Sequence, residues 1–291
     1  MAESPLREVF RKLLKSIPFK LGALLLSGLV LAALLADAIA PYSYRDQDLS
    51  QRFQPPSFSS SKPGRAPHLL GTDNLGRDLF SRLLFGARIS LVVGLLSVSI
   101  SLLVGGLLGA LAGYAGGATD SVISRLFDLM LAFPSILLAI AIVSVLGEGL
   151  GNVMLAVGVV GIPIFGRQAR ASVLTTRELD YVQAARSLGA SPVRILFVHV
   201  LPNCLNPLIV LAALGVGTAV LDTAGLSFLG LGAKAPFPEW GTILADTYQF
   251  YKRAPWMVAF PGLSIMAMVL GCNLLGDGLR DVLDPRMAEK G

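Results

Sequence analysis

Six long windows without a charged side chain constrain the fold of this chain more than any other feature of its sequence. They cover residues 21–36, 89–119, 129–147, 149–166, 200–221 and 254–276. An α-helix needs about 20 mostly apolar residues to cross a hydrocarbon core about 30 Å thick. Charged residues make up only 15% of the 291 residues, whereas soluble chains carry about 25%. The pattern therefore predicts an all-α membrane protein with six transmembrane helices, rather than a soluble protein with buried helices.

The charges between the windows predict how the chain sits in the membrane. Basic residues favour the cytoplasmic side, and a small majority of the Lys and Arg residues lies there if the N-terminus is inside. Seven cations in residues 41–88 oppose this orientation. The first apolar run is longer than the core of a cleavable signal, so we expect an uncleaved first span. Six spans then place both termini in the cytoplasm of a multi-pass protein of the inner membrane, in contact with lipid.

The net charge of +5 does not indicate a nucleic-acid partner. No basic run is interleaved with aromatic residues, and the cations lie in the connecting segments. Lys and Arg beside membrane spans serve to orient them, which explains the balance. The two cysteines, Cys204 and Cys272, have neither a metal-ligand spacing nor the pattern of a disulfide framework. We expect free thiols and no metal site.

Small residues in the second window predict close helix packing. Gly105, Gly109 and Gly113 repeat every four residues and therefore lie along one face of a helix. In lipid, small residues at this spacing let two helix backbones approach each other closely. Pro134 lies inside the third window and is expected to kink it.

The segment before the second window is expected to lie outside the membrane. Residues 41–70 are rich in Pro, Ser and Gly, which is typical of an irregular loop. The sequence GTDNLGRD at 71–78 places apolar and basic side chains where a calcium loop needs oxygen ligands, so we expect a turn. From Leu79, apolar residues recur at helical spacing beside Ser81 and Arg82. This pattern predicts an amphipathic helix lying at the outer interface and leading into the second span.

The connection from 167 to 199 is too long for a simple turn between two helices. Asp180 is placed to cap a helix that begins at Tyr181, with Gln183 reaching back in a capping-box arrangement. Ala184 and Ala185 favour helix and present little bulk. We therefore expect a first short helix on the cytoplasmic surface.

A second short helix is predicted directly afterwards. Gly189 is placed to end the first helix in a left-handed conformation. Ser191 then caps the second helix, with Pro192 at its first position. Leu201 and Pro202 lead into the fifth span. Two helices joined by a glycine elbow form a surface knob that is suited to docking a partner.

This loop resembles the EAA-type motif of permeases in binding-protein-dependent ABC importers. The resemblance rests on Gln183-Ala184-Ala185, then Gly189, then Leu201-Pro202. In that family the motif forms the coupling helix that seats in a groove of the cytoplasmic ATPase. This chain departs from the motif with Gln in place of the first Glu and with His199 in place of the usual isoleucine.

The resemblance extends over nearly the whole chain after residue 20. The segments HLLGTDNLGRD at 68–78, LSFLGLG at 226–232, EWG at 239–241 and NLLGDGLRDVLDP at 273–285 are similar to the second permease of dipeptide, oligopeptide and nickel importers. The resemblance implies a type I ABC importer permease fold. It divides the chain into a tail, first helix and outer loop (1–84), a five-helix domain (85–280) with coupling helices at about 180–200, and a cytoplasmic tail (281–291).

The resemblance also implies the partners and the mechanism. The chain would pair with a similar second permease, two ATPase subunits and an extracytoplasmic substrate-binding protein. ATP and Mg²⁺ would be used by the ATPase subunits, and this chain would bind no cofactor itself. The permeases would switch between outward-open and inward-open states as the coupling helices follow the ATPases. The cargo implied is a dipeptide or oligopeptide, with nickel or a metal chelate as the alternative.

Two other classes of membrane protein remain as alternatives. A multispan enzyme needs a nucleophile and base, or paired carboxylates, at membrane depth, and the six windows contain no charged residue and no histidine. His199 is either a proton-handling residue or, as we prefer, an interfacial side chain. A channel would not need the knob between 167 and 199. The chain has no GxxxxGK[ST] phosphate loop, so we expect no catalytic residues and a separate ATPase.

Asp222 lies at the outer end of the fifth window and has two interpretations. As a helix cap it would begin a short segment at 223–229. On the translocation path it would attract the amino group of a peptide or a metal cation.

Overall fold

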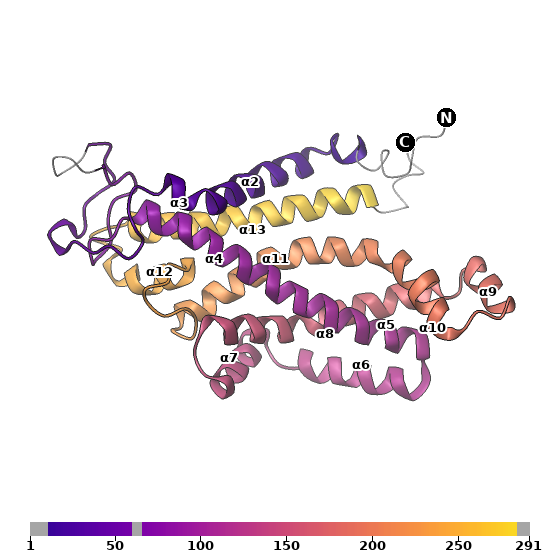
Figure 1. Cartoon of the computed structure of the whole chain (residues 1–291). Helices are drawn as coiled ribbons and strands as arrows, with labels where there is room; N and C mark the ends of the chain where they lie inside the picture. The colour runs from indigo at the N-terminus through magenta and orange to yellow at the C-terminus, as the bar shows by residue number, and fades with distance from the viewer. Residues whose placement is uncertain (1–10, 60–65, 284–291) are drawn as a thin grey trace.

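The computed structural model describes residues 11–59 and 66–283, which are mostly helical (Figure 1). The expected tail at 281–291 lies outside the described residues from 284 onward. The helices, in chain order, are α2 (Ile17–Leu34), α3 (Ala36–Ile39), α4 (Leu79–Ile100), α5 (Gly106–Ala115), α6 (Gly117–Leu131), α7 (Ser135–Leu146), α8 (Leu150–Thr176), α9 (Asp180–Ser187), α10 (Pro192–Arg194), α11 (Leu205–Phe228), α12 (Trp240–Thr247) and α13 (Trp256–Leu283). A π-helical segment, Ser101–Gly105, joins α4 to α5. A second one, Ile195–Val200, and a 3-10 turn, Leu201–Cys204, join α10 to α11.

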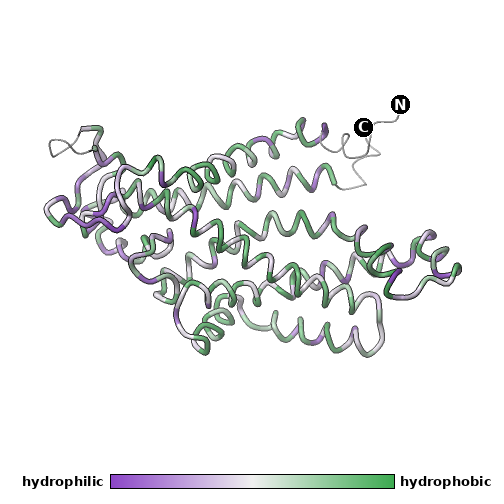
Figure 2. The backbone as a smooth tube through the Cα atoms, in the orientation of Figure 1, coloured by the Kyte–Doolittle hydropathy of each residue, from purple (hydrophilic) through white to green (hydrophobic). Residues whose placement is uncertain are grey.

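The described part of the chain contains the six predicted spans, if one bent helix pair counts as a span. The sixth span is the pair α6 and α7, whose axes are bent by 94°. Apolar residues follow the helices, and polar residues gather in the connections at the two ends (Figure 2). The continuous spans are Ile17–Leu34, Leu79–Ala115, Leu150–Thr176, Pro192–Phe228 and Trp256–Leu283.

The third span differs from the single helix that the sequence predicts at 129–147. The chain leaves α6 after Leu131 and begins α7 at Ser135, with Pro134 between them at φ −55° and ψ 130°. Proline has no N–H to donate, and its ring disfavours helical backbone at the residue before it. The expected kink at Pro134 is therefore a complete break in the helix.

The predicted interfacial helix is the beginning of the second span and not a separate element on the membrane surface. α4 starts at Leu79 and continues without a break, so the domain boundary expected at 84/85 falls inside it. Asp78 caps α4 by accepting a hydrogen bond from the backbone N–H of Ser81 at 2.8 Å. Arg82 is buried, with Nη1 3.4 Å from Asp73. The amphipathic pattern is present, but Arg82 on its polar side faces Asp73 of the packed 66–78 segment instead of water.

The segment 71–78 is a turn, as predicted, and α12 packs beside it. Gly71 and Gly76 have φ values of +79° and +73°. Trp240 of α12 donates a hydrogen bond from Nε1 to the carbonyl of Leu83 at 3.1 Å. Glu239 caps α12, and burial raises the pKa of its carboxyl above the ordinary value for glutamate. The bond from Trp240 holds α12 against the beginning of α4.

The two ends of the helix bundle differ in what they carry (Figure 1). The beginning of α2 and the end of α13 lie at the same end as α9 and α10. The described parts of the loop, 41–59 and 66–78, and α12 lie at the opposite end. The connection between α8 and α11 is therefore on the same side of the bundle as both ends of the described chain.

The glycine stripe of the second span packs directly against α8, which confirms the close helix packing that the sequence predicts. A Cβ atom at Gly105 would lie 3.0 Å from Phe165, and one at Gly113 would lie 2.9 Å from the carbonyl oxygen of Arg170. A Cβ at Gly109 would overlap the backbone of Gly166. The two helix backbones thus approach each other more closely than any other residue type would allow.

We predict that Gly109→Ala destabilises the protein, because the added methyl group meets backbone that has nowhere to move. Overpacking of this kind costs about 1–3 kcal/mol. The matched control is Gly106→Ala in the same helix, where a Cβ meets no atom within 4 Å. Heating the purified protein and measuring the fraction that stays monodisperse should give a lower Tm for Gly109→Ala only. Equal Tm values for the two variants would contradict the close contact.

Candidate functional site

The connection between α8 and α11 forms the predicted knob, but its first helix begins one residue earlier than expected. The N-cap is Leu179, which has extended backbone and makes no side-chain capping bond. Asp180 therefore lies in the first helical turn, where a carboxylate is favoured by the helix dipole. Gln183 donates a hydrogen bond from Nε2 to the carbonyl of Arg177 at 3.3 Å. The predicted capping box of Asp180 and Gln183 is thus wrong.

The glycine elbow is confirmed. Gly189 has φ +79° and follows the last turn of α9. The N–H of Ala190 donates to the carbonyl of Ala185 at 3.1 Å, and the N–H of Gly189 donates to that of Arg186 at 3.0 Å. This pair of bonds is the Schellman arrangement, in which glycine supplies the left-handed residue. A Cβ at Gly189 would meet no atom within 4 Å, so its backbone conformation, and not its surroundings, selects glycine.

The second helix also begins as predicted, but it is not a separate short helix. Ser191 Oγ accepts a hydrogen bond from the N–H of Arg194 at 3.4 Å, with Pro192 at the first position. From there the chain continues through the π-helical segment and the 3-10 turn into α11. Leu201 and Pro202 lie in that 3-10 turn. The predicted second helix is therefore the beginning of the fifth span itself.

The knob has its own apolar core, which ties it to the bundle. Tyr181 donates a hydrogen bond from its hydroxyl to the carbonyl of His199 at 3.1 Å, which joins α9 to the π-helical segment. Cys204 and Cys272 are both free thiols, as predicted. The buried members of the core come from the knob, from α5 and from α8: Ala110, Val173, Val182, Ile195, Val200 and Cys204.

The knob exposes large apolar side chains, beside the charged residues Asp180, Arg186 and Arg194. Leu188 is 88% exposed and Val193 is 68% exposed. Ala184 is also exposed and adds little bulk. Exposed apolar side chains on a surface that is supported by its own buried core are suited to contact with another protein.

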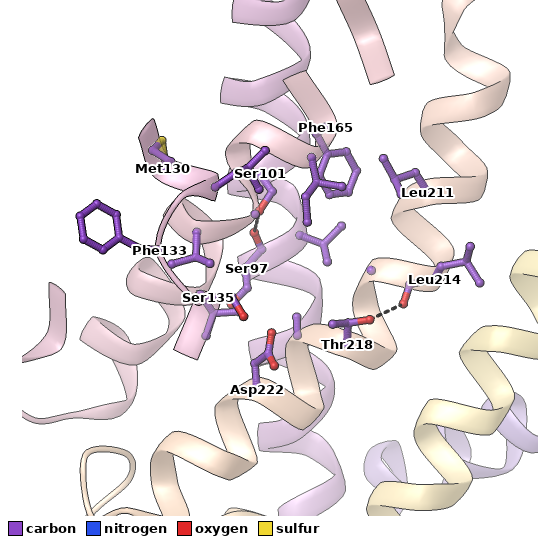
Figure 3. Close-up of a pocket in the computed structure, with 18 residues that line it drawn as sticks. Ser97, Ser101, Met130, Phe133, Ser135, Phe165, Leu211, Leu214, Thr218 and Asp222 are labelled. Atoms are coloured by element: carbon purple, nitrogen blue, oxygen red, sulfur yellow. Dashed lines mark hydrogen bonds between the residues drawn. The ribbon is translucent and has the colours of Figure 1, made fainter. Parts of the chain in front are cut away.

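A cavity of about 320 Å³ lies farther along the bundle, between α4, the break of α6 and α7, α8 and α11 (Figure 3). In Figure 3, Asp222 and Ser135 lie at one end of this cavity, and Met130 and Phe165 lie toward the other. Its walls are formed by Ser97, Val98, Ser101, Met130, Leu131, Phe133, Ser135, Val157, Val160, Gly161, Ile164, Phe165, Leu211, Leu214, Gly215, Thr218, Ala219 and Asp222.

Asp222 supplies the one carboxylate among these wall residues. It lies inside α11, which continues to Phe228, so its interpretation as a helix cap is wrong. Its other interpretation, a place on the translocation path, remains a prediction. The nearby hydroxyls are already used within the bundle, since Ser101 Oγ donates to the carbonyl of Gly158 at 2.6 Å and Ser97 Oγ to that of Met154 at 3.0 Å.

Two family models match this chain. Residues 105–289 match the binding-protein-dependent transport system inner membrane component. Residues 4–56 match the N-terminal transmembrane domain of oligopeptide transport permease C. The two matches include the first span, the knob and every span after the second, and they leave residues 57–104 unmatched.

Several curated proteins are similar over almost their whole length. A dipeptide transport system permease protein of Alkalihalophilus pseudofirmus is 50% identical, over 98% of this chain and 91% of its own. A di/tripeptide transport system permease protein of Pseudomonas aeruginosa is 49% identical, over 98% and 93%. A glutathione transport system permease protein of Pectobacterium atrosepticum is 41% identical, over 98% and 92%.

The fold has a counterpart among solved structures. The MetNI methionine ABC transporter, in an inward-facing conformation, matches 69% of this chain and 95% of its own chain with a TM-score of 0.57. The sequences are 20% identical, so this match concerns the fold alone. Six spans, the knob and these matches lead to one conclusion: the chain belongs to the binding-protein-dependent transport system inner membrane components, the multi-pass permease subunits of ABC importers.

Proposed function

We propose that this chain is one of two permease subunits of an ATP-driven importer and forms half of a path for dipeptides or short oligopeptides. One observation supports the proposal most strongly. The chain combines an exposed knob with its own apolar core, at one end of the bundle, and a cavity whose wall contains a carboxylate. The relatives reported above carry peptide names, which favours peptide over nickel as the cargo.

Asp222 fits a peptide cargo by its charge. A free peptide carries an ammonium group at its N-terminus, and a carboxylate at membrane depth is costly unless it meets a cation or water. Among the described residues, Asp222 forms no ion pair, so its charge is available to a ligand. The remaining wall is largely apolar, which suits varied side chains.

We propose that this chain assembles with a second permease, two ATPase subunits and a binding protein. A second, similar permease would supply the other half of the path. The exposed face of the knob would seat against one of two cytoplasmic ATPase subunits, which bind and hydrolyse Mg·ATP. The knob, the start of α2 and the end of α13 would then all be cytoplasmic. An extracytoplasmic binding protein would deliver substrate at the opposite end, above the 41–78 loop and α12.

Transmission from the ATPase to the path would use rigid contacts. The core of the knob joins α5 and α8, and α11 begins in the knob and carries Asp222. A displacement of the knob therefore moves the walls of the cavity. ATP favours the state in which the knobs of both permeases fit the closed ATPases, which shifts the population between inward-open and outward-open forms.

We predict that Gly189→Val uncouples the complex. A β-branched residue at φ +79° is strained by roughly 1–3 kcal/mol, which redirects the elbow. ATP hydrolysis by the reconstituted complex should lose its stimulation by loaded binding protein, and uptake should fall. Gly189→Asn should be milder, because asparagine tolerates this conformation. Full stimulation in Gly189→Val would show that the knob is not the coupling element.

We predict that Asp222→Asn lowers peptide uptake roughly tenfold, equivalent to about 1.4 kcal/mol, while the complex still assembles. Asparagine has nearly the same size and lacks the charge that would attract the ammonium group. Thr218→Val, in the same wall one turn away, keeps the charge of Asp222 and serves as the control. Uptake of a labelled dipeptide into vesicles measures both. Unchanged uptake in Asp222→Asn would remove this residue from the path.

A further inference from the structure

A second hollow, of about 400 Å³, lies between α6 and α8 and is lined by charged side chains. Its lining residues are Ser124, Asp128, Arg167 and Arg170. On α8, Arg167 and Arg170 follow Ile164 at spacings of three residues, which places all three on one face of the helix. Ile164 also lines the main cavity. The second hollow therefore continues the wall of the cavity along α8.

The same continuity holds on α6. Ser124, Asp128 and Leu131 follow one another at spacings of four and three residues and share one helix face. Leu131 lines the main cavity, whereas Ser124 and Asp128 line the second hollow. Because α6 begins and α8 ends at the end of the bundle that carries the knob, the second hollow lies on the knob side of the cavity (Figure 1).

The two ion pairs of this hollow differ in how firmly they are held. Arg170 contacts both carboxylate oxygens of Asp120, through Nε at 2.5 Å and Nη2 at 2.6 Å. Arg167 contacts Asp128 through a single bond, from Nη2 to Oδ1 at 2.5 Å. The side chains of Arg167 and Asp128 are 55% and 61% exposed. A guanidinium group has five N–H donors. Arg167 uses one of them on Asp128, so it can donate hydrogen bonds to a second carboxylate.

The path offers a carboxylate, Asp222, and a guanidinium group, Arg167, which complement the ammonium and carboxylate groups of a free peptide. Asp222 and Val157 line the same small cavity, and Val157 precedes Arg167 by ten residues of α8, or about 15 Å. A dipeptide spans at most about 7 Å. A dipeptide is therefore shorter than this backbone separation, and we assign Asp222 and Arg167 to two successive contacts of the peptide.

We propose that Arg167 binds the C-terminal carboxylate of the peptide at an inner station, made of Arg167 and Asp128, before release to the knob side. Asp128 holds the guanidinium until the carboxylate of the substrate replaces it, and it then faces the ammonium group. The peptide is a zwitterion with no net charge, and the Arg167–Asp128 pair also has none. Binding of the peptide therefore leaves the site without net charge. This inference rests on the proposed peptide cargo.

The test compares a labelled dipeptide with its C-terminally amidated form in vesicles that contain the full complex and saturating binding protein. The same binding protein delivers both peptides to every variant. A change in their uptake ratio between variants therefore reports a change in the selectivity of the permease and not of the binding protein. We expect Arg167→Gln to reduce the preference for the free carboxylate roughly tenfold, the scale of a lost charged hydrogen bond. Arg167→Lys should retain part of the preference.

The matched control is Arg125→Gln, which removes a cation from the exposed side of α6 outside the hollow. It should leave the ratio unchanged. An unchanged ratio in Arg167→Gln would overturn the inner station, whereas ATP-dependent peptide uptake in the same vesicles would still support the proposed function. If Arg167→Gln abolishes uptake of both peptides, the Asp128→Asn variant tests the proposal instead. This variant frees Arg167 and should keep or increase the preference for the free carboxylate. A reduced preference would overturn the proposal.

Discussion

The close backbone contact between α5 and α8 is the constraint on which the rest of the structure depends. A Cβ at Gly109 would overlap the backbone of Gly166, and a Cβ at Gly166 would overlap the ring of Phe127. On one side of this contact, Ala110 and Val173 join the core of the knob. On the other side, Ser101 and Phe165 form part of the cavity wall. The knob and the cavity are therefore built on a single rigid pair of helices.

The fifth span gives a second connection between the same two places. Pro192 lies in the knob and Asp222 lies in the cavity, and the helix between them extends for about 45 Å. It is interrupted by a π-helical segment and a 3-10 turn directly after the knob. Irregular turns of this kind are frequent where helices change shape during function. We therefore propose that the irregular helix, beside the rigid wall, lets the cavity change shape if the knob moves.

Patterns that depend on nearby residues were predictable from the sequence. The six spans, the glycine stripe, the elbow at Gly189 and the cap at Ser191 follow from hydropathy, helical spacing and the backbone preferences of single residues. The sequence-based capping box at Asp180 failed because the backbone of Leu179 starts the helix one residue earlier. Residue-level reasoning also missed the buried position of Arg82, since its acidic partner belongs to a loop whose packing the pattern does not encode.

The charged hollow carried no sequence signal at all. Arg167 and Asp128 are 39 positions apart and meet only because α6 packs against α8. The break at Pro134 was expected as a kink, but its consequence was not. It turns α7 away from α6 and places Phe133 and Ser135 in the cavity wall.

The central claim is that the knob seats against the ATPase, and site-directed photocrosslinking tests it most directly. A photoreactive group is attached to Leu188→Cys, which is 88% exposed, in a chain whose Cys204 and Cys272 are replaced by serine. Phe58→Cys, 91% exposed at the other end of the bundle, is the control. The account predicts crosslinks from position 188 to an ATPase subunit and none from position 58. Crosslinks to the ATPase from position 58 alone would contradict it.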